Sequence, residues 1–130
     1  MLRRSAIQKG RTFQKTICDR LKAVFGFTDD DIRTPVGCET GADIKLMSAH
    51  SRAVLPYSFE LKNVEKLNFW QAFEQAKGHG ALTPVLIAKK NHTKPLVVMD
   101  FEDWMKMVEA LNTQSAPTTE QPDDESSTTI

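Results

Sequence analysis

The stretch that decides the fold is residues 41–62, GADIKLMSAHSRAVLPYSFELK. Its first part, ADIKLMS, has apolar residues at every second position, which is typical of a strand. HSRA predicts a turn, and VLPYSFELKN alternates again and predicts a second strand. Pro56 belongs near the start of that strand or at a sheet edge, because proline cannot donate to a sheet ladder. The stretch therefore predicts two neighbouring strands joined by a turn.

Two carboxylates and an amine converge if these strands pair. Side chains alternate across a strand, so Glu60 and Lys62 must project from one face, opposite Phe59 and Leu61. Asp43 opens the preceding strand, and pairing through the turn would bring it beside Glu60. We therefore expect the three charged groups to share one site.

This combination suits phosphodiester cleavage, which needs a strong nucleophile and stabilisation of the developing charge. One or two Mg²⁺ ions supply both when oxygen ligands hold them. Asp43 and Glu60 are such ligands, and the backbone carbonyl of Leu61 can add another. Lys62 can orient the attacking water and offset phosphate charge. Without Lys62, the two carboxylates would fit a structural Ca²⁺ site equally well. The alternative without a functional site is that Asp43 caps a turn and that Glu60 and Lys62 form an exposed ion pair.

The rest of the chain predicts a small α/β domain, with helices packed on a mixed central sheet. Asp100 is expected to cap the last helix. Helices are predicted at residues 5–25, 65–77 and 101–111, and strands at 32–36, 83–90 and 95–100. The apolar helix positions expected in the core are Phe13, Ile17, Leu21, Val24, Leu67, Trp70, Phe73, Ala76, Phe101, Trp104, Met105, Val108 and Leu111.

Composition divides the chain into a domain over residues 1–112 and a tail over 113–130. The tail has four acids and no Lys or Arg, so residues 1–112 hold all 17 basic and 13 of the 17 acidic residues, a formal net charge of +4. A Ser/Thr/Pro-rich acidic tail of this kind is expected to be disordered. No apolar run is long enough to span a membrane and no secretory signal is apparent, so we expect a cytoplasmic protein without membrane partners. Cys18 and Cys38 lack metal-ligand spacing and are expected as free thiols.

Basic residues cluster in two places where they could contact a phosphate backbone. A solvated helix face, or a solvated hairpin for the second cluster, would explain them as well. The candidate DNA-binding residues are Arg3, Arg4, Lys9, Arg11 and Lys15 near the N-terminus, and Lys89, Lys90 and Lys94 at and just after the end of the predicted strand 83–90.

The order of these motifs resembles the PD-(D/E)XK nuclease superfamily, whose metal ligands are an Asp and an acid-x-Lys on adjacent strands. Here sixteen residues separate Asp43 from Glu60 of the Glu60-Leu61-Lys62 motif. Within the superfamily, the chain is most similar to the archaeal-type and phage Holliday-junction resolvases, and the resemblance covers residues 5–111. It includes Lys9-Gly10 on the first helix and a Gln-Ala helix after the second strand.

The resemblance implies a restriction-endonuclease-like fold in a single domain, with Asp43 and Glu60 as Mg²⁺ ligands and Lys62 as the catalytic amine; Mn²⁺ is a common substitute. In these resolvases a first-helix Glu often completes the site, but Gln14 stands there in this chain and is a weaker ligand. Glu39 can compensate as a ligand or be only a turn residue. Gln71 is implied near the site, where it would orient water or contact DNA; a plain surface position is the alternative.

The sequence therefore predicts a Mg²⁺-dependent, structure-selective DNA endonuclease that resolves four-way junctions in DNA recombination and repair. A homodimer would supply the two symmetric cuts, and the setting would be a prokaryotic or phage-infected cell. Two alternatives stay open: another repair or restriction-type nuclease of the same fold, and a catalytically weak, nuclease-like DNA-binding phage accessory protein.

Overall fold

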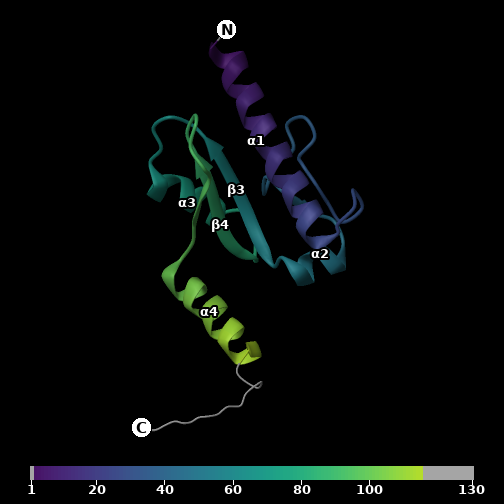
Figure 1. Ribbon diagram of the computed structural model, residues 1–130. Coiled ribbons are helices and arrows are strands. Elements are labelled where there is room, and N and C mark those ends of the chain that lie inside the picture. The colour runs from purple at the N-terminus through teal and green to yellow at the C-terminus, as the bar shows by residue number, and fades with distance from the viewer. Residues whose placement is uncertain (1, 116–130) are drawn as a thin grey trace. The chain divides into compact units, whose positions relative to one another are not determined.

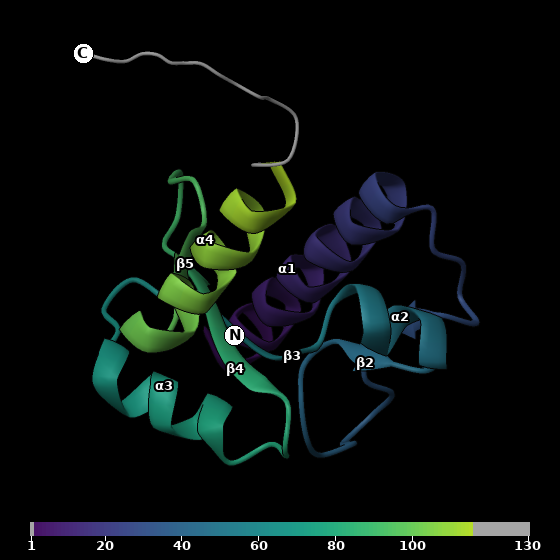
Figure 2. The same cartoon turned by 90° about the horizontal axis from the view of Figure 1, so that it is seen from below.

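The computed structural model describes residues 2–115, with side chains from 6 to 113. The chain divides into two compact units between Met99 and Asp100, and each is described by itself. The elements of the first unit, labelled in Figures 1 and 2 where there is room, are α1 (Leu2–Phe25), β1 (Ile32–Arg33), β2 (Lys45–Leu46), α2 (Ala49–Val54), β3 (Tyr57–Asn63), α3 (Phe69–Lys77), β4 (Thr83–Lys89) and β5 (Leu96–Val98).

The main sheet is mixed, which confirms the predicted α/β class. β3 and β4 run parallel over their whole lengths, and β5 pairs antiparallel with β4. The α3 helix forms the crossover that a parallel pair requires. β1 and β2 form a separate two-stranded antiparallel ribbon.

Helices cover both faces of the main sheet (Figure 2). On one face, Phe59 and Leu61 of β3 pack with Phe13 and Cys18 of α1 in the larger core cluster. On the other face, Leu86 and Ala88 of β4 pack with Ala72 of α3. Glu60 and Lys62 alternate with Phe59 and Leu61, so they belong to the α3 face.

The predicted hairpin through HSRA is wrong. Residues 49–54 form the α2 helix, which begins with a capping box in which Ser48 and Ser51 bond each other's backbone amides. That short helix redirects the chain, so β2 pairs with β1 and not with β3. Pro56 precedes β3, as its missing amide donor requires.

The helices differ from their predictions in extent and burial. α3 begins after the N-cap Asn68, whose side chain accepts the amide of Gln71, and not at residue 65. Ala72 and Ala76 form its buried face, so Ala76 is buried as predicted, while Trp70 is 86% exposed and lies outside the core. In α1, Phe13 is buried as predicted, but Val24 is exposed.

The second unit contains the helix α4 (Phe101–Ser115). Asp100 caps it as predicted, because its carboxylate accepts the Glu102 amide at 2.8 Å. Phe101 and Trp104 stack on each other, with ring centroids 6.1 Å apart. The helix continues to Ser115, past the predicted domain boundary; the rest of the predicted tail lies outside the described residues.

None of the helices in the described part of the chain is long and apolar enough to cross a membrane. Both cysteines are free, with Cys18 buried and Cys38 exposed, as the sequence predicts.

Candidate functional site

Hydrogen bonds hold Asp43 at the edge of β3, where no strand of the described residues pairs. Its backbone amide donates to the Phe59 carbonyl at 2.8 Å, and its carboxylate accepts the Leu61 amide at 2.8 Å. Gly41, just upstream, has a φ of +96°, which side-chain-bearing residues rarely adopt, and its missing Cβ leaves room for Lys45. Backbone contacts therefore hold Asp43 beside the Glu60-Leu61-Lys62 segment.

Glu60 is buried, with only 7% of its surface exposed, and both of its carboxylate oxygens have partners. Lys62 Nζ lies 3.3 Å from Oε2, as expected for side chains on one strand face. His79 Nε2 lies 2.5 Å from Oε1. A carboxylate oxygen has more than one lone pair, so both oxygens keep acceptor capacity beyond these contacts.

Sequence reasoning missed His79, because it shows no ligand spacing and follows the end of α3 between two glycines. α3 ends at Lys77, and Gly80 has a φ of +141°, a conformation that glycine tolerates and that turns the chain into β4. The Gly78-His79-Gly80 sequence signals such a turn, but nothing in it identifies Glu60 as the partner.

Gln14 reaches the site from α1, as the resemblance implies. Its amide nitrogen donates to Asp43 Oδ1 at 3.2 Å. The contact gives Asp43 a third hydrogen bond, from a residue that is 29 positions away in the chain. In this orientation the amide is a donor to the carboxylate, and rotation of the amide group would present its oxygen instead.

Burial raises the pKa of Asp43 above its ordinary value of 3.8. The Leu61 amide lowers that pKa by bonding the carboxylate, while the negative charge of Glu60 raises it further. Lys62 and His79 act in the opposite direction, with smaller effects. The partly buried Asp43 carboxylate and the buried Glu60 carboxylate therefore repel each other, and an added cation would relieve that repulsion.

The donor set fits Mg²⁺. In the described part of the chain, no three His, Cys, Asp or Glu side chains are grouped so that they could hold a metal ion by themselves. Mg²⁺ does not need one, since it is commonly held by one or two carboxylates, with water and substrate phosphate filling the other positions. Asp43, Glu60 and the Leu61 carbonyl would hold it; that carbonyl projects from the same side of the strand as the Leu61 amide that meets Asp43.

A cavity of about 460 Å³ opens at this site. Gln75, on the last turn of α3, lines it, whereas Gln71 does not line this cavity. Gln71 is exposed near the start of α3. The residues lining the cavity are Thr40, Gly41, Asp43, Glu60, Lys62, Gln75, Gly78 and His79.

The Glu39 carboxylate is bound by Arg33, so it is not free to act as a metal ligand. The guanidinium meets both carboxylate oxygens, at 2.9 and 3.0 Å, and the Val36 amide donates to one of them at 3.0 Å. These contacts lower the pKa of Glu39 from 4.5 to about 2. Glu39 lines a smaller cavity together with Gln14 and Asp43, so it lies near the site but is engaged elsewhere.

Glu39→Gln is expected to loosen the loop before Asp43 at neutral pH. The pKa of Glu39 is lower in the folded protein, so its stabilising effect is present above about pH 4.5 and is lost as the pH falls toward about 2. Amide hydrogen exchange at Val36 should therefore be faster in the variant than in the wild type at pH 7, and equal near pH 2. Equal exchange at both pH values would show that the Arg33 contact does not order this loop.

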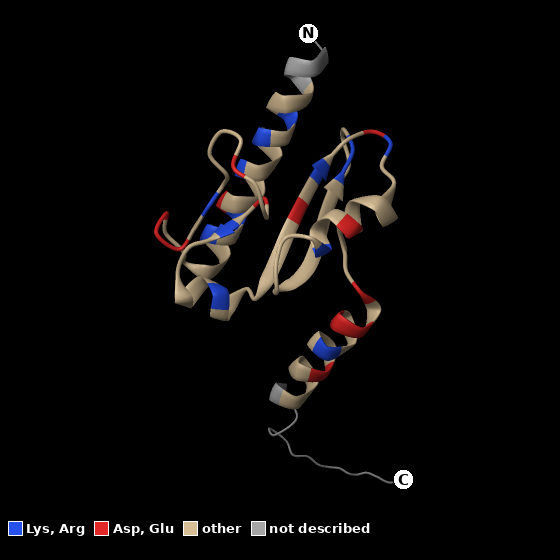
Figure 3. Cartoon of the chain, turned by 180° about the vertical axis from the view of Figure 1, so that it is seen from behind, with Lys and Arg blue, Asp and Glu red and all other residues tan. Residues whose placement is uncertain are grey.

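The candidate DNA-binding residues fall into separate groups. Basic residues recur along α1 and gather at the end of the main sheet near the β4–β5 turn (Figure 3). Lys15 pairs with Asp19 at 2.9 Å, and Lys9 lies 3.9 Å from Glu65. Arg11 lines the cavity that contains Gln14 and Asp43. Lys89, Lys90 and Lys94 line another cavity; Arg3 and Arg4 lie outside the described side chains.

Comparisons of the chain with protein-family models, with curated proteins and with solved structures gave no match. The chemistry of the site therefore has to be inferred from its own residues.

Proposed function

We propose that this protein is a Mg²⁺-dependent DNA endonuclease with a restriction-endonuclease-like fold, acting on branched DNA such as four-way junctions as a homodimer. The observation that supports it best is the contact between the Asp43 carboxylate and the Leu61 amide. It places one carboxylate beside the strand that carries Glu60 and Lys62. Metal-assisted hydrolysis needs this combination of two carboxylates and an amine, whereas a simple surface ion pair would not require Asp43.

Each residue then has a distinct role. Asp43, Glu60 and the Leu61 carbonyl hold the cation, which supplies Lewis acidity at the phosphate when bound. Lys62, whose ammonium lies 3.3 Å from Glu60, orients the attacking water and offsets negative charge on the phosphate. Gln14 fixes the rotamer of Asp43 through its amide.

Cleavage assays test the proposal directly. Labelled four-way junction, linear duplex and single strand are incubated with the protein in Mg²⁺ and in EDTA. We expect Mg²⁺-dependent cuts, faster on the junction than on the duplex. Equal cutting of junction and duplex would favour another nuclease of the same class. Binding without any cleavage would favour the DNA-binding accessory protein, for which the Gln14 contact is the supporting observation.

His79→Ala is expected to slow cleavage by raising the Mg²⁺ concentration that is needed. The imidazole holds one oxygen of Glu60, and loss of such a supporting contact typically costs about 10- to 100-fold in metal affinity or activity. Cleavage rates should be measured across a Mg²⁺ titration, with His92→Ala, an exposed histidine in the β4–β5 turn, as the control. A rate that is low at every Mg²⁺ concentration, with an unchanged midpoint, would contradict a positioning role.

A further inference from the structure

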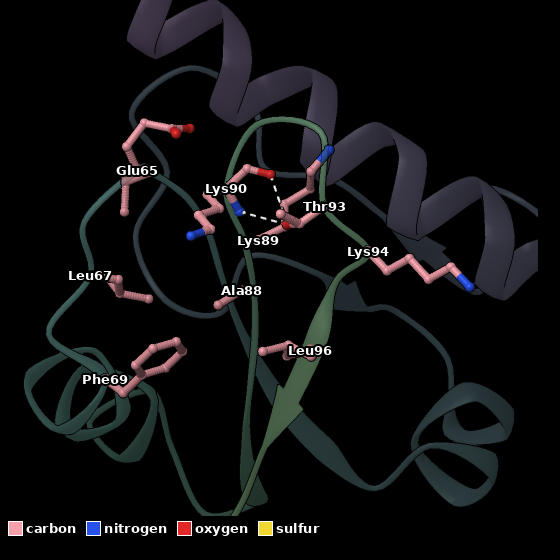
Figure 4. Close-up of a pocket in the computed structure, with 10 residues that line it drawn as sticks. Glu65, Leu67, Phe69, Ala88, Lys89, Lys90, Thr93, Lys94 and Leu96 are labelled. Atoms are coloured by element: carbon pink, nitrogen blue, oxygen red, sulfur yellow. Dashed lines mark hydrogen bonds between the residues drawn. The ribbon is translucent and has the colours of Figure 1, made fainter.

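A second cavity, of about 450 Å³, lies at the end of the sheet where β3 and β4 finish (Figure 4). Leu67 and Phe69, from the segment entering α3, line one side; Leu96 of β5 lines the other, with Ala88 of β4 between them. Its volume is within the range of small-ligand pockets, about 300–1,000 Å³. The cavity can therefore take a ligand with a flat apolar part.

The rim of this cavity is positively charged. Lys89, Lys90 and Lys94 line it, and within the described part of the chain none of the three forms an ion pair. Glu65 also lines it, but its carboxylate already accepts the Asn91 amide at 2.7 Å. The Lys94 side chain extends away from Leu67 and Phe69 (Figure 4), whereas the apolar residues and the positively charged rim together are complementary to a ligand that is both planar and anionic.

The rim belongs to an ordered turn. The Lys90 amide donates to Thr93 Oγ1 at 3.1 Å, and Thr93 Oγ1 donates to the Lys90 carbonyl at 2.9 Å (Figure 4). The Val64 amide donates to the Lys89 carbonyl at 3.1 Å, which joins the turn to the end of β3. A preformed rim reduces the ordering cost of binding.

The cavity lies on the same face of the sheet as the candidate active site. Ala88, on its floor, pairs in register with Lys62 of the parallel neighbouring strand. Paired residues of parallel strands project to the same side, so the cavity is on the face that carries Glu60 and Lys62.

We propose that this cavity binds an unpaired nucleotide of the DNA substrate, with its base against Phe69 and Leu67 and its phosphates near the lysines. The inference rests on the proposed function and deepens it, because overhangs, flaps and branch points whose central base pairs have opened present unpaired bases, whereas an intact duplex does not. Stacking of a base on an aromatic side chain is worth about 1–3 kcal/mol, and the lysines add backbone attraction that tracks the phosphates.

Two adjacent residues of β5 provide a matched test. Leu96 and Val97 are 60% and 62% exposed, but only Leu96 lines the cavity. Leu96→Glu and Val97→Glu make the same change of charge on similarly exposed positions. Affinity is measured by fluorescence anisotropy in EDTA, for a duplex with a single-stranded overhang and for the blunt duplex. Phe69→Ala, with the exposed Trp70→Ala as its control, is the second variant pair.

We expect Leu96→Glu to weaken binding of the overhang DNA by roughly 5- to 150-fold relative to Val97→Glu, the range that loss of one stacked base implies. The two variants should bind the blunt duplex equally. Phe69→Ala should show the same selective loss, and thermal melting should confirm that each variant is folded.

Equal overhang affinities for Leu96→Glu and Val97→Glu, with Phe69→Ala binding like Trp70→Ala, would overturn the inference. If the wild-type protein binds an acidic, aromatic peptide and does not bind the overhang DNA, the inference is also overturned. If the selective loss occurs but wild-type protein with Mg²⁺ cuts no DNA, the nuclease proposal fails and the nucleotide site stands. If wild-type protein cuts DNA and the variants show no selective loss, only the nucleotide site fails.

Discussion

Asp43→Asn is expected to abolish DNA cleavage while the metal-free protein unfolds at the same or a higher temperature. The substitution removes one of the two carboxylates proposed to hold Mg²⁺. An amide oxygen can still accept the Leu61 amide, so the contact between residue 43 and β3 persists. Loss of activity and retention of the fold are therefore separable at this position.

The expected direction of the stability change follows from the pKa of Asp43. Burial raises that pKa above 3.8, so the folded protein disfavours the charged carboxylate. A raised pKa contributes stability at low pH, which is lost as the pH rises through the folded value. At pH 7 in EDTA the neutral Asn should therefore be at least as stable as Asp, and this advantage should disappear below about pH 3.8.

Cleavage of the junction and thermal melting at both pH values provide the measurements. Asp30→Asn is the matched control, because it makes the same change at an exposed carboxylate. Wild-type cleavage by Asp43→Asn would remove Asp43 from the proposed metal site. Melting of the variant well below the wild type at pH 7 would mean that the charged carboxylate contributes to the fold.

Lys62→Ala is expected to reduce the rate of cleavage on bound DNA by about 10² or more, the loss typical of a group that stabilises charge in the transition state. The ammonium lies beside Glu60 and is partly exposed, so it can meet both a phosphate and the attacking water. Affinity for DNA should fall much less, because many backbone contacts share that work.

Single-turnover cleavage at saturating protein measures the rate, and anisotropy in Ca²⁺ measures affinity separately. Lys66→Ala is the control, since Lys66 is an exposed lysine shortly after the same strand and lines neither the site nor the second cavity. A variant that cuts at the wild-type rate once bound would make Lys62 a phosphate clamp and not a catalytic group.

The features of this protein that the sequence alone determined are those that depend on local periodicity. Alternation in β3 predicted that Glu60 and Lys62 share a face, and the 3.3 Å contact between them confirms it. The position of Pro56, the Asp100 cap and the apolar run of β4 were also predicted correctly, because each depends on residues that are close in the chain. The α/β class followed from the order of these elements.

Only the tertiary structure decided which distant residues meet at the site. The sequence predicted Asp43 beside Glu60 through a strand pairing that does not form; single backbone and carboxylate contacts to β3 bring it there instead. His79 and Gln75 line the site because α3 ends there, and Trp70 is exposed although its helical spacing predicted it on the buried face. Such placements depend on the residues at which tertiary packing makes each element start and stop. A local sequence pattern does not determine those residues.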